Sequence, residues 1–482
     1  MKQSSCLRTY QTRQKPDFWY PFSVHQADHP CLHLSDIFDA KLAAAVVGIN
    51  RKEVVTDLEL RCSPCLAVAA GPLQLSDTAI NLVAKQCSKL KSLHIEGSPY
   101  LTEVSLRALV QDAKRLESLT LGSCPKIGEG AIMSFLTDHP YLGKFELKGI
   151  MAAESYSNGV RKLSLLQRRV CSLRQLHTLI LVNCPGLRDR SMLKFSDIHF
   201  RMLRHLVIDD CRGVTHLGLM WLVGQTMNPV KLRSIKLANF YFSTNAELME
   251  VLSLSSEAIE SIILDSCNFG LVMPPYSFEP VARECPRLKV IKLVHCESIM
   301  DFFLSWLSMS CLGLKELSLI GFSVSARDHG ILGNFFRILH LNGIKKIELG
   351  RCCQVTDKDI CMIARSCLGI LQELILDECP LISRDFALDL RERCPNLIKL
   401  GFSRTLIRDD EIKILVAARF EHLEELNLMG CPLITDSTLH TLAHAASFLP
   451  KLKRINVADC TRITRKTVDH YQSFWKISSE WS

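Results

Sequence analysis

The chain has 482 residues, of which 48% are apolar and 22% are charged, and its formal net charge is +8. This composition is typical of a folded protein, and the length is too great for one compact core. No run of five Lys or Arg residues occurs, which argues against nucleic acid as a partner. The polar and aromatic stretch Met1 to Tyr20 lacks the apolar core of a signal peptide, and the longest apolar run, Leu42 to Ile49, is far short of the roughly 20 residues that span a membrane. We therefore expect a cytoplasmic or nuclear protein with no membrane partner.

Residues 1–52 do not fit the repeat described below. The spacing of their apolar residues predicts one helix from Asp36 to Ile49. We interpret residues 1–52 as a capping segment, because the open end of a repeat array would otherwise expose apolar surface.

A repeated unit begins at Val55, and we expect its first helix to run from about Ser76 to Cys87. The unit is clearest in Leu423-Glu-Glu-Leu-Asn-Leu-Met-Gly-Cys431, where alternation predicts a short strand with Leu426 and Leu428 on one side. Thr435, Asp436 or Ser437 can then cap a helix. The first apolar position of this frame recurs over 362 residues in 13 steps, about 28 residues per repeat, at Leu90, Leu116, Leu142, Leu176, Leu203, Leu232, Ile259, Leu288, Leu314, Ile344, Leu371, Leu397, Leu423 and Leu452.

One strand and one helix cannot bury their apolar faces alone, so such units must stack. The frame L-x-x-L-x-L-x-x-C is that of a leucine-rich repeat. We predict an α/β leucine-rich-repeat solenoid, or horseshoe, over residues 53–470, with parallel strands on the concave face, helices on the convex face and about 14–15 repeats.

Two segments depart from the repeat pattern, and they allow two interpretations. Met151 to Gly159 resembles an inserted loop, and Asn268 to Tyr276 replaces a helix cap with a segment that contains Pro274 and Pro275. These segments are either drifting loops or an edge reshaped for a partner. Four repeats also lack cysteine at the usual place and carry other residues there, namely Ile150, Phe240, Phe322 and Thr405.

Most of the 21 cysteines occupy two fixed places in the repeat. A residue type that recurs at one place indicates packing, so we expect reduced, buried thiols. Cys62 and Cys65 have C-x-x-C spacing, but Cys62 is explained by its place in the repeat, so no metal or cofactor is expected. The strand-end cysteines are Cys62, Cys124, Cys184, Cys211, Cys267, Cys296, Cys352, Cys379, Cys431 and Cys460, and those near helix ends are Cys87, Cys171, Cys285, Cys311, Cys367 and Cys394.

The C-terminal segment, residues 471–482, is rich in aromatic residues. We expect Tyr471, Phe474 and Trp475, helped by Trp481, to cover the last repeat as a cap.

The residues that flank each buried leucine pair should form exposed columns on the concave face. Several of these positions are apolar and are interspersed with aspartate, which is the composition of a protein-binding surface. The alternative is that β-branched residues simply favour strands. The candidate partner-binding residues are Ile180, Val182, Val207, Asp209, Ile263, Asp265, Val294, Ile320, Ile375 and Asp377.

The stretch Cys353-Gln-Val-Thr-Asp357 through Cys367, and the stretch Cys431-Pro-Leu-Ile-Thr-Asp436, resemble the cysteine-containing repeats of F-box/LRR proteins. This resemblance covers about residues 53–470. It implies a non-catalytic module that recognises a protein substrate for an SCF-type ubiquitin ligase, with a Skp/cullin adaptor as a further partner. The nearest match to an F-box, Leu34-Ser-Asp-Ile-Phe38, lacks the usual Leu-Pro and a following Trp, so a stand-alone scaffold or adaptor remains the alternative. No catalytic motif of a known kind occurs in the chain.

Overall fold

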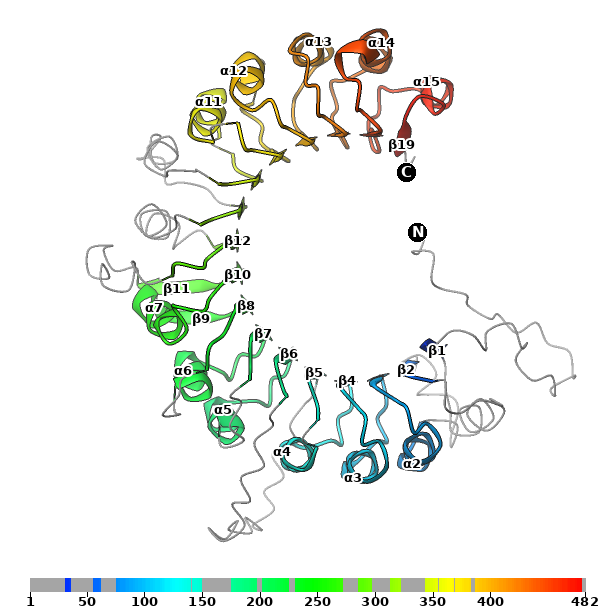
Figure 1. Cartoon of the computed structure of the whole chain (residues 1–482), viewed down its shortest axis with the longest axis vertical. Helices are drawn as coiled ribbons and strands as arrows, with labels where there is room; N and C mark the ends of the chain where they lie inside the picture. The colour runs from blue at the N-terminus through cyan, green and yellow to red at the C-terminus, as the bar shows by residue number, and fades with distance from the viewer. Residues whose placement is uncertain are drawn as a thin grey trace, which may run out of the picture. The chain divides into compact units, whose positions relative to one another are not determined.

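The computed structural model describes residues 31–35, 55–61, 75–139, 141–149, 175–196, 202–224, 230–271, 285–296, 313–321, 343–353, 355–367, 369–382 and 386–478. The chain divides into two compact units, Met1–Lys231 and Leu232–Ser482. In both units a strand is followed by a turn and, in most repeats, by a described helix (Figure 1). Among these described residues, no helix has the length and apolar character that crossing a membrane requires.

In the first unit, seven parallel strands pair in sequence order, each in register with the next. They are β1 (Cys31–Ser35), β2 (Asp57–Arg61), β3 (Ser92–Glu96), β4 (Ser118–Gly122), β5 (Lys144–Lys148), β6 (Thr178–Val182) and β7 (His205–Asp209). The described helices are α2 (Asp77–Gln86), α3 (Glu103–Asp112), α4 (Glu129–Asp138), α5 (Asp189–Ser196) and α6 (His216–Gly224).

In the second unit, ten strands also pair in parallel and in register. They are β8 (Ser234–Ala238), β10 (Ser261–Asp265), β12 (Val290–Val294), β13 (Glu316–Ile320), β14 (Lys346–Gly350), β15 (Glu373–Ile375), β16 (Lys399–Gly401), β17 (Glu425–Asn427), β18 (Arg454–Asn456) and β19 (Lys476–Ser478). The described helices are α7 (Asn245–Ser253), α11 (Asp357–Ser366), α12 (Phe386–Arg393), α13 (Asp409–Ala417), α14 (Asp436–His444), the 3-10 turn η6 (Ala446–Phe448) and α15 (Arg465–Tyr471).

The alternation expected from the sequence is confirmed in the strands. In β6, Leu179 and Leu181 are fully buried, whereas the three residues around them are partly exposed. In the last repeats, Leu426 and Leu428 are likewise buried. The core of each unit therefore lies between the sheet and its helices, and the other face of the sheet remains open. We call that side the open face.

The structure contains strands that the sequence analysis did not assign. Strand β1 lies in the segment interpreted as a cap, and its Leu32 and Leu34 pair with Leu58 and Leu60. Strand β19 lies in the expected C-terminal cap and pairs with β18. The helix expected at Asp36–Ile49 and the loop at Met151–Gly159 lie outside the described residues, and the capping roles stay predictions.

One expected loop is partly a strand. Strand β11 (Asn268–Leu271) pairs in parallel with β9 (Tyr241–Thr244), forming a small second sheet. The ring of Phe269 stacks on that of Phe242, with centroids 5.1 Å apart and planes at 7°. Phe240, which takes the place of a strand-end cysteine, is buried against Phe242. A bulky aromatic cluster thus replaces the small thiol here. Residues 272–276 of the expected loop lie outside the described part.

The strand-end cysteines link neighbouring repeats. Fifteen cysteines are reduced thiols, and nine of the ten strand-end cysteines are described and buried, as the sequence predicts. The thiol of Cys379 donates to the carbonyl of Leu349 in the preceding repeat over 2.9 Å, and Cys431 and Cys460 make the same contact at 3.0 Å. These cysteines thus pack and also satisfy a buried carbonyl.

Aspartates at helix starts form a second link between repeats. The carboxylate of Asp409, the first residue of α13, accepts hydrogen bonds from the amide and hydroxyl of Thr435, at 2.9 and 2.7 Å. Thr435 is the N-cap of α14, and its hydroxyl accepts from the amide of Ser437. The pairs Asp77–Thr102, Asp189–Thr215 and Asp436–Thr464 repeat the arrangement. Each carboxylate therefore holds the start of the next helix, a role that the expected capping did not include.

Candidate protein-binding face

The open face carries all ten candidate residues predicted from the sequence. Each occupies a strand or strand-end position whose side chain points away from the helices, and each is partly exposed, neither fully buried nor fully open to solvent. The strand phase deduced from the alternation is therefore right at every one of these positions.

In the first unit, four candidates lie together on two adjacent strands. Ile180 on β6 pairs in register with Val207 on β7, and Val182 pairs with Asp209. Three apolar side chains therefore adjoin one another with a carboxylate at their edge. Side chains directly opposite on paired strands lie about 5 Å apart at Cβ, so these three form one continuous apolar area.

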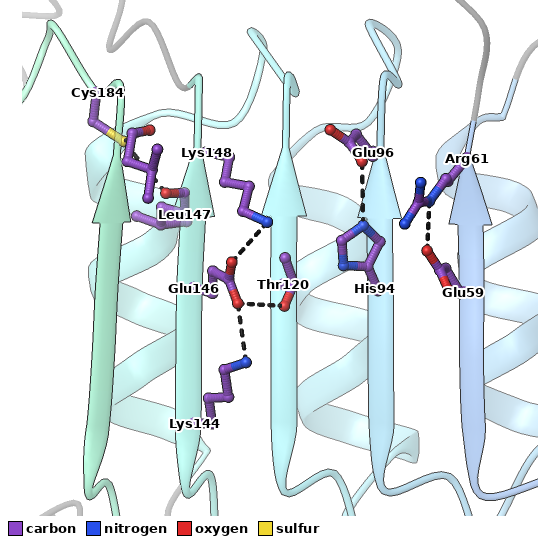
Figure 2. A network of polar contacts seen from close by, with 11 residues as sticks. Glu59, Arg61, His94, Glu96, Thr120, Lys144, Glu146, Leu147, Lys148 and Cys184 are labelled. Atoms are coloured by element: carbon purple, nitrogen blue, oxygen red, sulfur yellow. Dashed lines mark hydrogen bonds and ion pairs between the residues drawn. The ribbon is translucent and has the colours of Figure 1, made fainter. Parts of the chain in front are cut away.

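On one side, this apolar area borders a polar network on the open face (Figure 2). Glu146 on β5 pairs in register with Ile180. Its carboxylate contacts the ammonium groups of Lys148 at 2.8 Å and Lys144 at 3.1 Å and accepts a hydrogen bond from Thr120 at 3.4 Å. Burial alone would raise the pKa of Glu146, but the two lysines outweigh it and hold the pKa below its ordinary value. The negative charge of Glu146 is therefore already balanced by Lys144 and Lys148.

Two further polar contacts in Figure 2 lie on β2 and β3. There, Arg61 pairs with Glu59, and Nε2 of His94 lies 3.4 Å from a carboxylate oxygen of Glu96. The open face of the first unit therefore changes along the sheet from paired charges on β2, β3 and β5 to apolar side chains on β6 and β7.

In the second unit, the candidates do not form one continuous apolar area. Ile263 on β10 stands between Lys236 on β8 and Lys292 on β12. Val294 on β12 and Ile320 on β13 do pair directly. The expected patch is thus divided here by lysines, because the apolar residues fall in different columns of the sheet.

The remaining candidates of the second unit lie near carboxylates. Ile375 on β15 pairs with Glu348 on β14 and with Gly401 on β16. Asp377 follows β15, and its carboxylate accepts a hydrogen bond from the amide of Ser403 at 2.8 Å. Burial raises the pKa of Asp377, and the nearby charges of Glu348 and Glu378 add to this effect despite the bonds from Ser403. Lys236, Lys292 and Glu348 also lie on the open face, at positions that the sequence pattern predicts to be exposed but that the candidate set does not include.

The chain is similar to parts of several known proteins. No family model matches it. F-box/LRR-repeat protein 4 of Bos taurus is 29% identical over 159 residues, which is 32% of this chain and 24% of that protein. The repeating strand, the strand-end cysteine and the buried leucine frame are all observed in the structure. The chain is a cysteine-containing leucine-rich-repeat protein.

Solved structures of other leucine-rich-repeat proteins cover most of this one. The yeast Rad7 and Elc1 complex has a TM-score of 0.34 at 15% identity, covering 91% of this chain and 79% of that chain. The TLR13–ssRNA13 complex has a TM-score of 0.42 at 14% identity, covering 89% and 62%, and an internalin of Listeria monocytogenes has 0.39 at 13%, covering 80% and 81%. The match to the curated Bos taurus relative spans about a quarter of that relative's length.

The described thiols are a further group of side chains that could take part in chemistry. Within the described ranges, no group of three or more His, Cys, Asp or Glu side chains is arranged to hold a metal ion. Cys62 and Cys65 lie outside those ranges. Burial raises the pKa of Cys460 to about 11 and that of Cys394 to about 12, so these thiols stay protonated at neutral pH. A protonated, buried thiol is a packing group rather than a nucleophile.

Proposed function

We propose that this leucine-rich-repeat protein is a non-catalytic protein-recognition module that binds its partner on the open face of the sheet. The observation that carries the proposal is the apolar area of Ile180, Val182 and Val207, which is partly exposed although Leu179 and Leu181 fill the core side of the same strand. Covering such an area removes apolar surface from water at about 25 cal/mol per Å². Asp209 at its edge would act on orientation and association rate more than on affinity.

We further propose that the recognised protein is a substrate of an SCF-type ubiquitin ligase in the cytoplasm or nucleus, with a Skp/cullin adaptor as the second partner. The sequence likeness to F-box/LRR-repeat protein 4 supports this role. The alternative is a stand-alone scaffold or adaptor, which the absence of Leu-Pro before Ser35 favours. The two roles share the open face and differ only in the ligase link.

The open face is tested by a charge placed in the apolar area. The double variant Ile180→Glu with Val207→Glu should keep the wild-type melting temperature, because both side chains point away from the core. It should lose capture of the proteins that the wild type enriches from cells, measured by quantitative mass spectrometry. The matched control is Val104→Glu with Leu217→Glu, which changes two exposed apolar residues of α3 and α6. If the open-face variant captures the same proteins at wild-type strength, recognition lies elsewhere.

The ligase link is tested separately. The 482-residue chain and a chain that begins at residue 53 are each mixed with purified Skp and cullin, and binding is measured by pull-down. Binding that requires residues 1–52 supports the ligase role. No binding by the 482-residue chain supports the scaffold role and leaves the open face unaffected.

A further inference from the structure

The open face of the second unit carries charges that its own side chains leave unbalanced. Most of the surrounding charged residues are paired across strands. Nζ of Lys346 lies 3.6 Å from Glu373, Nζ of Lys399 lies 3.4 Å from Glu425, and Arg454 also pairs with Glu425. These pairs are formed by the first residue of each strand, which we call the first column of the sheet. In this column, positive and negative side chains alternate from β14 to β18.

The second and third columns, formed by the third and fifth positions of each strand, instead carry charged residues without an ion pair among the described residues. Lys236 and Lys292 form no ion pair with another residue of the described part, and neither do Glu348 and Asp377. All four are partly exposed. Glu348 is held by a hydrogen bond from Ser318 at 2.8 Å, and Asp377 by the amide of Ser403, so both carboxylates are fixed in place.

These four charges are sorted by sign. The lysines lie on β8 and β12, and the carboxylates lie on β14 and directly after β15. Ile320 on β13 lies between the two groups, and Val294, which pairs with it in register, lies beside Lys292 on β12. Asp265 is one carboxylate on the lysine side, and it accepts a hydrogen bond from the hydroxyl of Ser266 at 3.0 Å. The two lysines outnumber it. We call the six residues Lys236, Lys292, Val294, Ile320, Glu348 and Asp377 the charged band.

Two glycines adjoin the charged band. Gly350 pairs with Ile320 on the neighbouring strand, and Gly401 pairs with Ile375, and both have φ values that other residues adopt readily. A Cβ at Gly350 would lie 3.5 Å from Ile320, and one at Gly401 would lie 3.1 Å from the Asp377 carboxylate. Gly350 and Gly401 are themselves buried, so the side chains of Ile320 and Asp377 lie against these glycines and are held close to the sheet.

We propose that the charged band binds an extended segment of a partner protein that has an acidic residue at one end, apolar residues in the middle and a basic residue at the other end. The acidic residue pairs with Lys236 and Lys292, the apolar residues cover Val294 and Ile320, and the basic residue pairs with Glu348 and Asp377. This inference rests on the proposed function and names the chemistry of the partner at that face.

The geometry sets the spacing of the two charges in the partner. Neighbouring strands lie about 4.8 Å apart, so Glu348 is about 10 Å from the Lys292 strand and about 19 Å from the Lys236 strand. An extended chain rises about 3.4 Å per residue, so the acidic and basic residues should be roughly three to six positions apart. The raised pKa of Asp377 agrees with this assignment, because a partner cation would offset the burial and like charge that raise it.

A displayed library of random 12-residue peptides, selected on the immobilised 482-residue chain, tests the proposal. We expect enriched peptides to carry an acidic and a basic residue on either side of apolar residues, at the stated spacing. The variant Lys236→Glu with Lys292→Glu should bind an enriched peptide roughly tenfold more weakly or worse, because like charges then face each other. The same variant should instead enrich peptides that are basic at both ends, a gain that unfolding could not produce. The control is Lys358→Glu with Lys466→Glu, two exposed lysines of α11 and α15.

Two outcomes would overturn the proposal. One is enrichment of peptides with no such charge pattern, or of peptides whose binding the charge reversal leaves unchanged. In that case the protein still recognises proteins, but not through the charged band. The other is no enrichment above uncoated support, which would exclude an extended segment as the occupant. The capture experiment on Ile180 and Val207 decides the proposed function independently of both.

Discussion

Replacing Asp409 with alanine should destabilise the α13–α14 region more than any neighbouring surface change. The carboxylate accepts three hydrogen bonds from the next repeat, from the amide and hydroxyl of Thr435 and from the hydroxyl of Thr438 at 2.5 Å. A hydrogen bond to a charged group contributes about 1.5–3 kcal/mol, but the three overlap and Asp409 is partly exposed, so water can replace some of them. We therefore expect a loss of about 2 kcal/mol for the group rather than three separate losses.

The adjacent Asp410 supplies a matched control. It has the same charge near the same helix start, but its side chain is exposed and its recorded ion pair is with Lys413 of its own helix, at 2.8 Å. Asp410→Ala should therefore change stability by no more than about 0.5 kcal/mol. Comparing the two variants removes the effect of the helix dipole, which both aspartates share.

Hydrogen exchange is the suitable measurement, because a repeat array need not unfold in one step. Peptides that cover α13 and α14 should exchange faster in Asp409→Ala than in the wild type and in Asp410→Ala. Peptides from α2 and α3, far away in the sequence, should not change. Equal acceleration in the two variants would refute the reasoning, since it would mean that the link to Thr435 contributes nothing beyond the local charge.

Three further outcomes are expected. Burial would raise the pKa of Asp409, but the hydrogen bonds from Thr438 and Thr435 leave this pKa below its ordinary value. The stabilisation by Asp409 is therefore complete above the unfolded pKa of about 3.9 and is lost as pH falls through the lower folded pKa. The difference in stability between wild type and Asp409→Ala should shrink on acidification below about pH 4 and not between pH 7 and 5. Leu426→Asp buries an uncompensated carboxylate and should lower the free energy of unfolding of the C-terminal repeats by several kcal/mol in urea unfolding. Glu425→Ala removes only partly exposed ion pairs to Lys399 and Arg454 and should lower it by about 1 kcal/mol or less. Similar losses in the two variants would contradict the strand phase. Because the described strand-end thiols are reduced and buried, dithiothreitol should leave the melting temperature unchanged, and a large drop would reveal disulfides.

The aromatic cluster after α15 shows how far such a cluster can be assigned from sequence. Tyr471 and Trp475 are buried as expected, but Phe474 is 61% exposed. The hydroxyl of Tyr471 also lies 2.7 Å from Nδ1 of His440 on α14. The sequence indicates which residues are aromatic, whereas the turn after α15 determines which ring faces inward. Trp481 lies outside the described residues.

The sequence by itself determined the repeat and everything that depends on local periodicity. Leucines two positions apart must lie on one face of a strand, so Leu179 and Leu181 are buried and Ile180 is outward wherever the strand sits. The cysteine slots follow in the same way, since a residue at a constant distance from the strand meets a constant environment in every repeat.

Only the tertiary structure decided which side chains meet across repeats. The pairing of Asp409 with Thr435, and the balance of Glu146 by two lysines, depend on the relative positions of neighbouring units. The same holds for the lysines that flank Ile263 and for strands β1 and β19. A period in the sequence specifies a face, but it does not specify whether a charge on that face finds a partner. That depends on side-chain reach and burial, which are properties of the folded sheet.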